Sequence, residues 1–213
     1  MLAIINAAGW PIWLLLITSV IAVALIIERM LALRQSKVAP GGMLQRVLSE
    51  YKPRGDNSVL AADLEMHSPL GRVLAAGLRN MTASREVMKE SIEETGRSVS
   101  HELERYLTSL GTIATLSPLL GLFGTIVGMI EIFASQTPGG SNPVMLAHGI
   151  SVALYNTGFG LLIAMPSLVF WRYYRARVDG FIVEMEQQAV RLVEVVHDGR
   201  EPRSTTGGTM YKK

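Results

Sequence analysis

Three long apolar segments dominate the hydrophobic pattern of the chain. The first runs from Trp10 to Ile27 without a charged residue, and the other two are Leu107–Ile130 and Gly149–Trp171. Because a helix needs about 20 mainly apolar residues to cross a bilayer, each segment is long enough to span a membrane. The pattern therefore predicts an all-α membrane protein with three transmembrane helices.

Small residues recur along one face of the second apolar segment. They follow one another at steps of three and four, a helical heptad rhythm: Gly111, Ala114, Pro118, Gly121, Thr125 and Gly128. Small residues let helix backbones approach closely in lipid, so this face should pack against another helix. We expect Gly121, Gly124 and Gly128, together with Gly160 on the third segment, to be helix-packing positions.

The polar sequence after the first segment predicts short helices. The turns Pro40–Gly42 and Pro53–Asn57 bound one over Met43–Tyr51, and two more are expected over Val59–Met66 and Pro69–Asn80. None of these stretches has the alternating pattern of a strand.

A longer helix is expected to start after the capping residue Ser84 and to run unbroken to about Ala134. Its apolar seam leads directly into the small-residue face: Ile92, Gly96, Val99, Leu103, Tyr106 and Leu110. A second seam extends the third segment beyond the membrane: Val178, Ile182, Met185, Ala189, Leu192 and Val196. The two seams predict long cytoplasmic helical extensions that pack on each other.

Charged residues set the expected topology. Basic residues follow the first segment and the third, where the sequence is Trp171–Arg177, whereas the turn Gln136–Pro143 carries no charge. Under the positive-inside rule the basic flanks are cytoplasmic, and the turn and N-terminus face outward. The expected order is an outer N-terminus (1–9), a transmembrane helix (10–33), a cytoplasmic helical loop (34–106), a transmembrane helix (107–134), an outer turn (135–146), a transmembrane helix (147–171), a cytoplasmic helix (172–198) and a disordered tail (199–213).

Composition argues against most other classes of protein. Of 213 residues, 18% are charged and 49% hydrophobic, and the net charge of +2 gives no case for nucleic-acid binding. There is no cysteine, and the four histidines lack the spacing of metal ligands. No nucleophile–base arrangement or phosphate-binding glycine loop is present. We therefore expect no cofactor and no enzymatic activity.

Polar side chains inside the apolar segments are the candidate functional residues. Thr125 and Thr157 carry hydroxyls that both donate and accept hydrogen bonds, although the residues alone favour interhelical packing for them. Asn156 suits an interhelical hydrogen bond. Glu131 is an intramembrane carboxylate, which suggests function, with an interfacial position as the alternative. The basic residues Arg29, Arg172, Arg175 and Arg177 are expected to anchor the membrane boundary.

Four stretches carry a resemblance to a known family. Gly9–Trp13 with Ile27–Arg29 resembles the first span of ExbB/TolQ/MotA-type proton-channel subunits, and Ser68–Gly77 resembles their cytoplasmic loop. Leu110–Ile130, which contains the string Pro-Leu-Leu-Gly-Leu-Phe-Gly-Thr, is similar to their second span, and Gly149–Pro166 to their third. Three spans with a cytoplasmic loop suit ExbB and TolQ, because MotA-type subunits have four.

The resemblance implies a bacterial inner-membrane motor subunit that forms a pentameric ring around single-span ExbD-type partners and energises TonB-type transport. It places Thr125 and Thr157 at the pore and puts Val152 where many ExbB and TolQ sequences carry a glutamate. Together with Glu131 and Asn156, which are candidates by their polarity within the apolar segments, the two threonines form the expected proton pathway. The alternatives are a TolQ-like subunit for envelope maintenance and a passive membrane scaffold. Expected contacts are further copies of the chain, ExbD-type and TonB-type proteins and membrane lipid.

Overall fold

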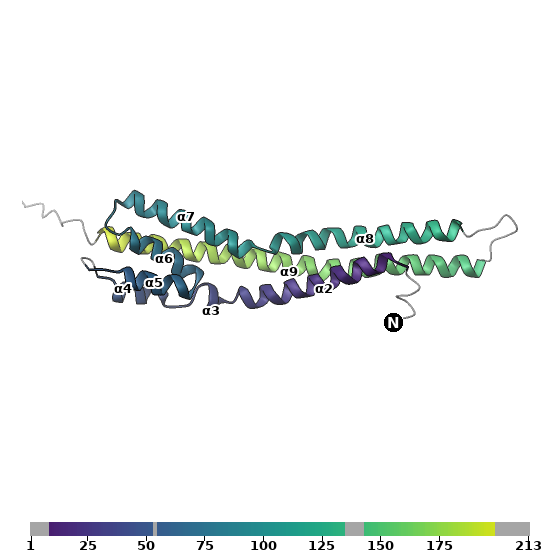
Figure 1. The fold of residues 1–213 in the computed structure, drawn as a ribbon, viewed down its shortest axis with the longest axis horizontal. Coiled ribbons are helices and arrows are strands. Elements are labelled where there is room, and N and C mark those ends of the chain that lie inside the picture. The colour runs from purple at the N-terminus through teal and green to yellow at the C-terminus, as the bar shows by residue number, and fades with distance from the viewer. Residues whose placement is uncertain (1–8, 53–54, 135–142, 199–213) are drawn as a thin grey trace, which may run out of the picture. The chain divides into compact units, whose positions relative to one another are not determined.

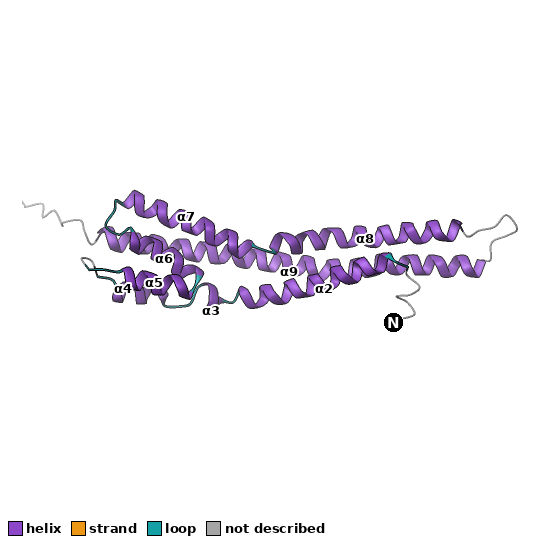
Figure 2. Cartoon of the chain, in the orientation of Figure 1, coloured by secondary structure: helices purple, strands orange, loops and turns teal. Residues whose placement is uncertain are grey.

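All the regular secondary structure is α-helical in the computed structural model, which describes residues 9–52, 55–134 and 143–198 (Figure 2). The helices in chain order are α2 (Pro11–Ala32), α3 (Gln35–Val38), α4 (Met43–Glu50), α5 (Ser58–His67), α6 (Pro69–Arg79), α7 (Arg85–Glu104), α8 (Leu107–Ala134) and α9 (Pro143–Asp198) (Figure 1). Residues 1–8, most of the expected outer turn and the expected disordered tail lie outside the described residues.

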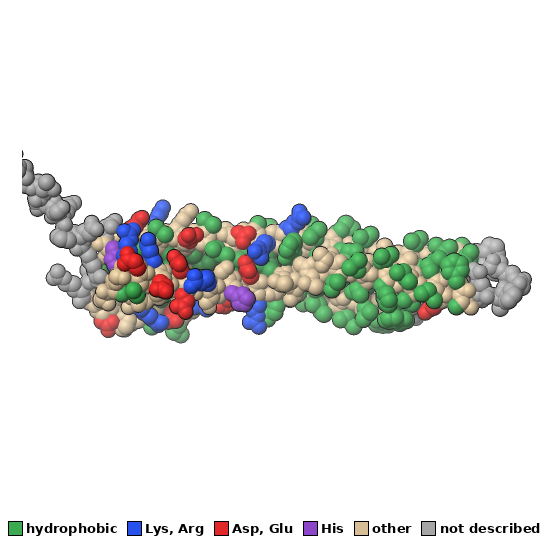
Figure 3. All heavy atoms as spheres, turned by 90° about the horizontal axis from the view of Figure 1, so that it is seen from above, with side chains coloured by type: hydrophobic (Ala, Val, Ile, Leu, Met, Phe, Trp, Pro, Cys, Tyr) green, Lys and Arg blue, Asp and Glu red, His purple; other side chains and the backbone are tan. Residues whose placement is uncertain are grey.

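The chain forms two compact units. The apolar unit comprises Met1–Arg34 and Leu103–Asp179, and the polar unit comprises Gln35–Glu102 and Gly180–Lys213. In the described residues, three helical stretches are long and apolar enough to cross a membrane: Pro11–Ala32, Arg85–Ala134 and Gly149–His197. Large apolar side chains lie exposed over the apolar unit, whereas charged side chains gather on the polar unit (Figure 3). The predicted all-α membrane fold with three candidate spans is confirmed.

Helix α2 packs inside the apolar unit against α8 and α9. Its buried Leu15 and Ala22 form a core with Ile163 of α9, and Ile113 and Leu120 of α8 and Phe159 of α9 pack against that core. Near its C-terminal end, the Tyr174 hydroxyl donates a hydrogen bond to the carbonyl of Ile26 over 2.9 Å. Burial of apolar side chains at one end and a buried hydrogen bond at the other fix the register of α2.

The short helices of the polar unit agree with the sequence prediction to within one residue at most ends. Helices α5 and α6 meet at a sharp corner where Ser68 caps α6 by accepting a hydrogen bond from the Gly71 amide over 3.0 Å. A Cβ on Gly71 would lie only 2.0 Å from the carbonyl oxygen of Leu64, so this corner requires a glycine. The short helix α3 was not predicted from the sequence.

Helix α6 continues the core of the polar unit towards α7 and α9. A Cβ on Gly77 would come within 3.0–3.2 Å of the side chains of Met88, Ile92 and Leu192, so the three helices are in close contact there. The predicted seam of α9 is confirmed, since Met185, Ala189, Leu192 and Val196 are buried. Ser84 caps α7, as predicted, by accepting a hydrogen bond from the Val87 amide over 3.4 Å.

The expectation of one unbroken helix from Ser84 to Ala134 is wrong. Helix α7 ends at Glu104, α8 begins at Leu107, and Tyr106 between them has a φ of +65°. That left-handed conformation is unfavourable for a bulky residue and ends a right-handed helix. Tyr106, which the seam placed in the core, is exposed, and Leu107 is buried in its place.

Arg29, which the sequence predicts to anchor the membrane boundary, contacts the chain at this break. Its side chain is buried, donates a hydrogen bond to the Leu103 carbonyl over 3.2 Å and pairs with Glu28. In an unbroken helix the amide of Leu107 would satisfy that carbonyl. The guanidinium groups of Arg29 and Arg105 also lie 5.2 and 4.8 Å from the centre of the Tyr106 ring, within the range of cation–π attraction.

Candidate functional site between two apolar helices

Helices α8 and α9 approach each other through glycines. A Cβ on Gly121 would lie 2.7 Å from the Asn156 carbonyl oxygen, and one on Gly160 would lie 2.5 Å from the Ser117 carbonyl oxygen. These neighbours are backbone atoms, so the helices could not keep this separation if either glycine carried a side chain. The approach continues along the helices, because Gly124 faces the Asn156 side chain and Gly128 faces Ala153.

The two threonines meet across this contact. The hydroxyl oxygens of Thr125 on α8 and Thr157 on α9 lie 2.6 Å apart, a hydrogen-bond distance between residues 32 positions apart in the sequence. Both side chains are half-buried. The Thr125 oxygen also lies 3.1 Å from the carbonyl oxygen of Gly121 and 3.2 Å from that of Ala153.

The hydroxyl protons can be assigned from these neighbours. A carbonyl oxygen only accepts, so the hydrogen bonds from Thr125 to Gly121 and Ala153 both draw on the single Thr125 proton. The short contact between the two hydroxyls is then completed by the Thr157 proton, which Thr125 accepts. This arrangement leaves lone pairs on Thr157 for a further donor. If both hydroxyls reversed, Thr125 would donate to Thr157, and the Thr157 proton would be free for a further acceptor. The pair can therefore exchange donor and acceptor roles without moving its backbone.

Asn156 and Glu131 have different surroundings. Asn156 is buried between the helices, as expected for interhelical contact, and its side chain packs on Gly124. Glu131 is exposed near the end of α8 and makes no ion pair or hydrogen bond with another described residue. The structure therefore brings together Thr125, Thr157 and Asn156 but not Glu131.

Several residues of the site escaped the sequence prediction. Ala153 contributes a carbonyl to Thr125, and the fully buried Ser117 contributes one against Gly160. A contact made by a main-chain carbonyl cannot be predicted from the type of side chain. The available signal was that Ala153 and Ser117 are small and lie four residues from Thr157 and Gly121. Trp171 was not predicted to contact α8, yet its indole lies over Gly111, close enough to leave no room for a Cβ.

No group of three or more histidine, aspartate or glutamate side chains among the described residues could hold a metal ion. The side chain of Val152 lies outside the part of α9 whose side chains are described. What the site offers is two hydroxyls and an amide between glycine-packed helices. Hydroxyl and amide groups both donate and accept hydrogen bonds, which is the chemistry needed to orient water.

Residues 65–187 match the model of the MotA/TolQ/ExbB proton channel family. The biopolymer transport protein exbB1 of Vibrio cholerae is 33% identical over 167 residues, which are 75% of this chain and 72% of that protein. The putative biopolymer transport protein ExbB-like 3 of Synechocystis is 30% identical over 191 residues, or 87% of this chain and 91% of that protein. The Tol-Pal system protein TolQ of Haemophilus influenzae is 30% identical over 104 residues, covering 47% of this chain and 46% of that protein.

Proposed function

The chain belongs to the MotA/TolQ/ExbB proton channel family, and we propose that it is an ExbB-type subunit that uses the proton motive force to energise TonB-dependent transport across the outer membrane. It is a multi-pass membrane protein, and members of this family are channel or motor subunits, not enzymes. Support for ExbB-type service comes from the relatives in Vibrio cholerae and Synechocystis, which match at least three quarters of this chain and are named as biopolymer transport and putative biopolymer transport proteins.

The pair Thr125–Thr157 is the observation that carries the proposal. A proton cannot cross a low-dielectric membrane without a titrating group or a chain of water. The pair has two exchangeable protons and adjustable acceptors at a half-buried position, and its hydroxyls avoid the cost of placing a charge there. In this proposal the threonines solvate and orient a carboxylate and do not titrate themselves.

That carboxylate would come from a partner. Glu131 is exposed and does not lie at the threonine pair, so this chain supplies no acid there among its described residues. We infer that an ExbD-type protein brings an aspartate on its single membrane helix to face Thr157. The lone pairs left on Thr157 would accept a hydrogen bond from the protonated acid, and the reversed pair would donate to the ionised acid.

A ring of copies, in the bacterial inner membrane, completes the proposal. Three membrane helices are too few to enclose a partner helix, so several copies must surround it. Five copies are proposed from the family. In a TonB system a further TonB-type protein would receive the work of the motor.

A TolQ-like role is the second candidate, because the TolQ protein of Haemophilus influenzae matches about half of this chain. Deleting the gene separates the two functions. Loss of energised uptake across the outer membrane, with normal envelope integrity, supports the ExbB-type role. Envelope leakage with normal uptake supports the TolQ-type role, and no defect in either would favour a passive scaffold. Each defect should be restored by the native gene but not by a Thr125→Val, Thr157→Val variant.

A further inference from the structure

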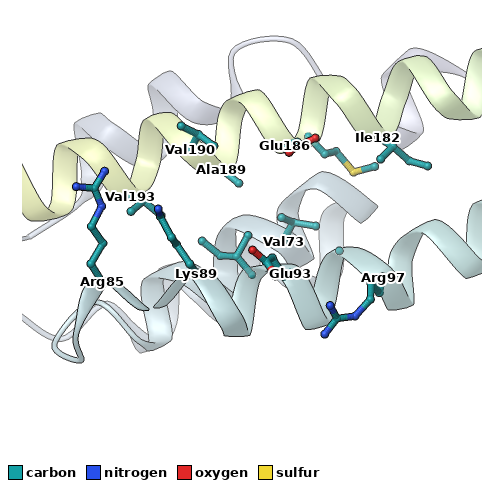
Figure 4. A pocket seen from close by; sticks show the side chains of 13 residues that line it. Val73, Arg85, Lys89, Glu93, Arg97, Ile182, Glu186, Ala189, Val190 and Val193 are labelled. Carbon is teal, nitrogen blue, oxygen red and sulfur yellow. The ribbon is translucent and has the colours of Figure 1, made fainter. Parts of the chain in front are cut away.

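A groove in the polar unit lies between α7 and α9. Its volume is about 360 Å³, and it is bounded by α7 and α9, with Val73 of α6 also contributing to its wall (Figure 4). Its apolar lining comes from both long helices: Ile92, Ile182, Met185, Ala189, Val190 and Val193. Covering an apolar surface of this kind with another apolar surface lowers the free energy, because both are removed from water.

The α7 side of the groove is basic. Arg85, Lys89 and Arg97 lie at multiples of four residues, so they follow a row that winds slowly around the helix beside the groove, with Glu93 between Lys89 and Arg97. In Figure 4, Arg85 and Lys89 project from α7 at one end of the groove and Arg97 at the other. None of the three cations lies within 4 Å of a carboxylate of another described residue. We call this row the basic lip.

Gly96 opens the floor of the groove. It lies on the buried seam of α7, yet a Cβ added to it would meet no atom within 4 Å. A glycine inside a helix costs about 1 kcal/mol relative to alanine, so it needs a compensating reason. Gly77, in the same unit, has such a reason within the chain because three side chains crowd it. At Gly96 the described part of the chain supplies none, and the space above it is open to a side chain from outside the chain.

The next face of α7 carries the opposite charge. Glu86, Glu90 and Glu94 are exposed at steps of four, and the exposed apolar Val87 lies beside them. The pKa of Glu86 is held below its usual range by hydrogen bonds from its own backbone amide and from the Ser84 hydroxyl, so it is ionised at neutral pH. None of the three lies within 4 Å of a cation of another described residue, although Lys89 and Arg85 of the same helix add a weaker electrostatic lowering of the Glu86 pKa. We call these four residues the acidic edge.

We propose that the groove of one copy receives the acidic edge of α7 from the next copy. This inference rests on the ring assembly proposed above and assigns one of its contacts. The basic lip spans roughly 18 Å and the acidic edge roughly 12 Å at 1.5 Å per residue, so the edge fits within the lip. Val87 enters the apolar groove while the glutamates meet Arg85, Lys89 and Arg97.

The contact is heterologous because each copy uses two different faces of α7. A heterologous contact repeats from copy to copy and closes into a ring when the rotation between copies allows it. Contact between identical faces would instead stop at a dimer. It would also bring like charges together, which is unfavourable. The charge pattern of α7 thus favours a repeating head-to-tail arrangement over a pair.

Cross-linking in isolated membranes tests the contact. The chain has no cysteine, so a Val87→Cys, Gly96→Cys variant carries one reactive thiol on the edge and one in the groove. The two positions are about 13 Å apart along one helix, too far for a short bismaleimide to join them within a chain. We expect a ladder of covalent oligomers from the double variant and nothing beyond a dimer from either single variant.

Two further variants show whether the groove itself is occupied. The Val87→Cys, Arg97→Cys variant should also give the ladder. Adding Gly96→Leu to it should abolish the ladder, because the leucine side chain fills the groove. Gly180→Leu is the matched control, since Gly180 is also a helical glycine with no atom within 4 Å of its added Cβ but does not line the groove. It should leave the ladder intact.

Charge exchange tests the lip and the edge together. Lys89→Glu or Glu90→Lys alone should lower ladder yield roughly two- to tenfold, because each replaces an exposed attraction with a repulsion. The double variant Lys89→Glu, Glu90→Lys should recover the yield, which loss of folding could not do.

Native mass spectrometry separates failure of this inference from failure of the ring. If native mass spectrometry shows a ring, three cross-linking results would overturn the groove contact but not the ring assembly. These are no ladder, dimers only, or a cross-link from Gly96→Cys to a different protein. A complex that contains only monomers overturns both. A ladder that survives Gly96→Leu also overturns the groove contact.

Discussion

The hydroxyl oxygen of Thr125 lies 2.6 Å from that of Thr157, and the carbonyls of Gly121 and Ala153 compete for the Thr125 proton. Thr157→Val should therefore remove the proton that completes this pair and the lone pairs that face a partner acid, while keeping the shape of the side chain. We expect proton-dependent activity to fall by roughly 10- to 100-fold, the worth of a hydrogen bond to a charged group.

Energised uptake in cells measures this effect, with subunit levels checked by immunoblot. Thr157→Ser keeps the hydroxyl and is the matched control, so it should retain most activity. Full activity in the Thr125→Val, Thr157→Val double variant would return both residues to simple packing.

The glycines between α8 and α9 should tolerate no side chain. A Cβ at Gly160 would lie 2.5 Å from the Ser117 carbonyl oxygen, so Gly160→Ala forces two backbones apart and should destabilise the protein by about 1–3 kcal/mol. Gly158→Ala, two residues away on α9, meets no atom within 4 Å and should be neutral or slightly stabilising. Thermal unfolding in mild detergent compares them, and equal melting temperatures would contradict the close approach.

Arg29 should stabilise the break between α7 and α8. Arg29→Gln removes its hydrogen bond to the Leu103 carbonyl and its position near the Tyr106 ring, and we expect a loss of about 1–3 kcal/mol in unfolding free energy. Arg172→Gln, at an exposed arginine, is the control and should change stability by less than about 0.5 kcal/mol. An identical loss from both variants would show that general charge, and not the buried contact, is responsible.

Glu131 should matter less than the threonines. Its side chain is exposed and makes no hydrogen bond or ion pair with a described residue, so Glu131→Gln should change proton-dependent activity by no more than about twofold. The same uptake measurement decides this. A loss as deep as that of Thr157→Val would place the carboxylate on the proton pathway.

The basic flanks predict that the sequence around Ser58 is cytoplasmic and that the turn around Ser141 faces outward. Cysteines introduced singly at these positions should react differently with an impermeant maleimide added to intact cells. Ser141→Cys should label, and Ser58→Cys should label only after the membrane is permeabilised. The reverse pattern would invert the topology.

The membrane character, the three spans and most short helices could be predicted from the sequence alone, because these features depend on local properties. An apolar run of sufficient length must be covered by lipid, and helical spacing alone places Met185, Ala189 and Leu192 on one buried face. The helix-packing role of the glycines on α8 could also be predicted, because small residues at heptad spacing permit close packing against any partner helix.

The contacts between side chains and carbonyls from distant segments became known only from the three-dimensional fold. Thr125 and Thr157 are far apart in the sequence, and the carbonyl of Ala153 that competes for the Thr125 proton has no side-chain signature. The break at Tyr106 was hidden because apolar spacing continues through it, whereas the left-handed residue is supported by Arg29, which lies on another helix. Periodicity reports which face of a helix is buried, but contacts between distant segments set the local backbone wherever they outweigh the preference of a helix to continue.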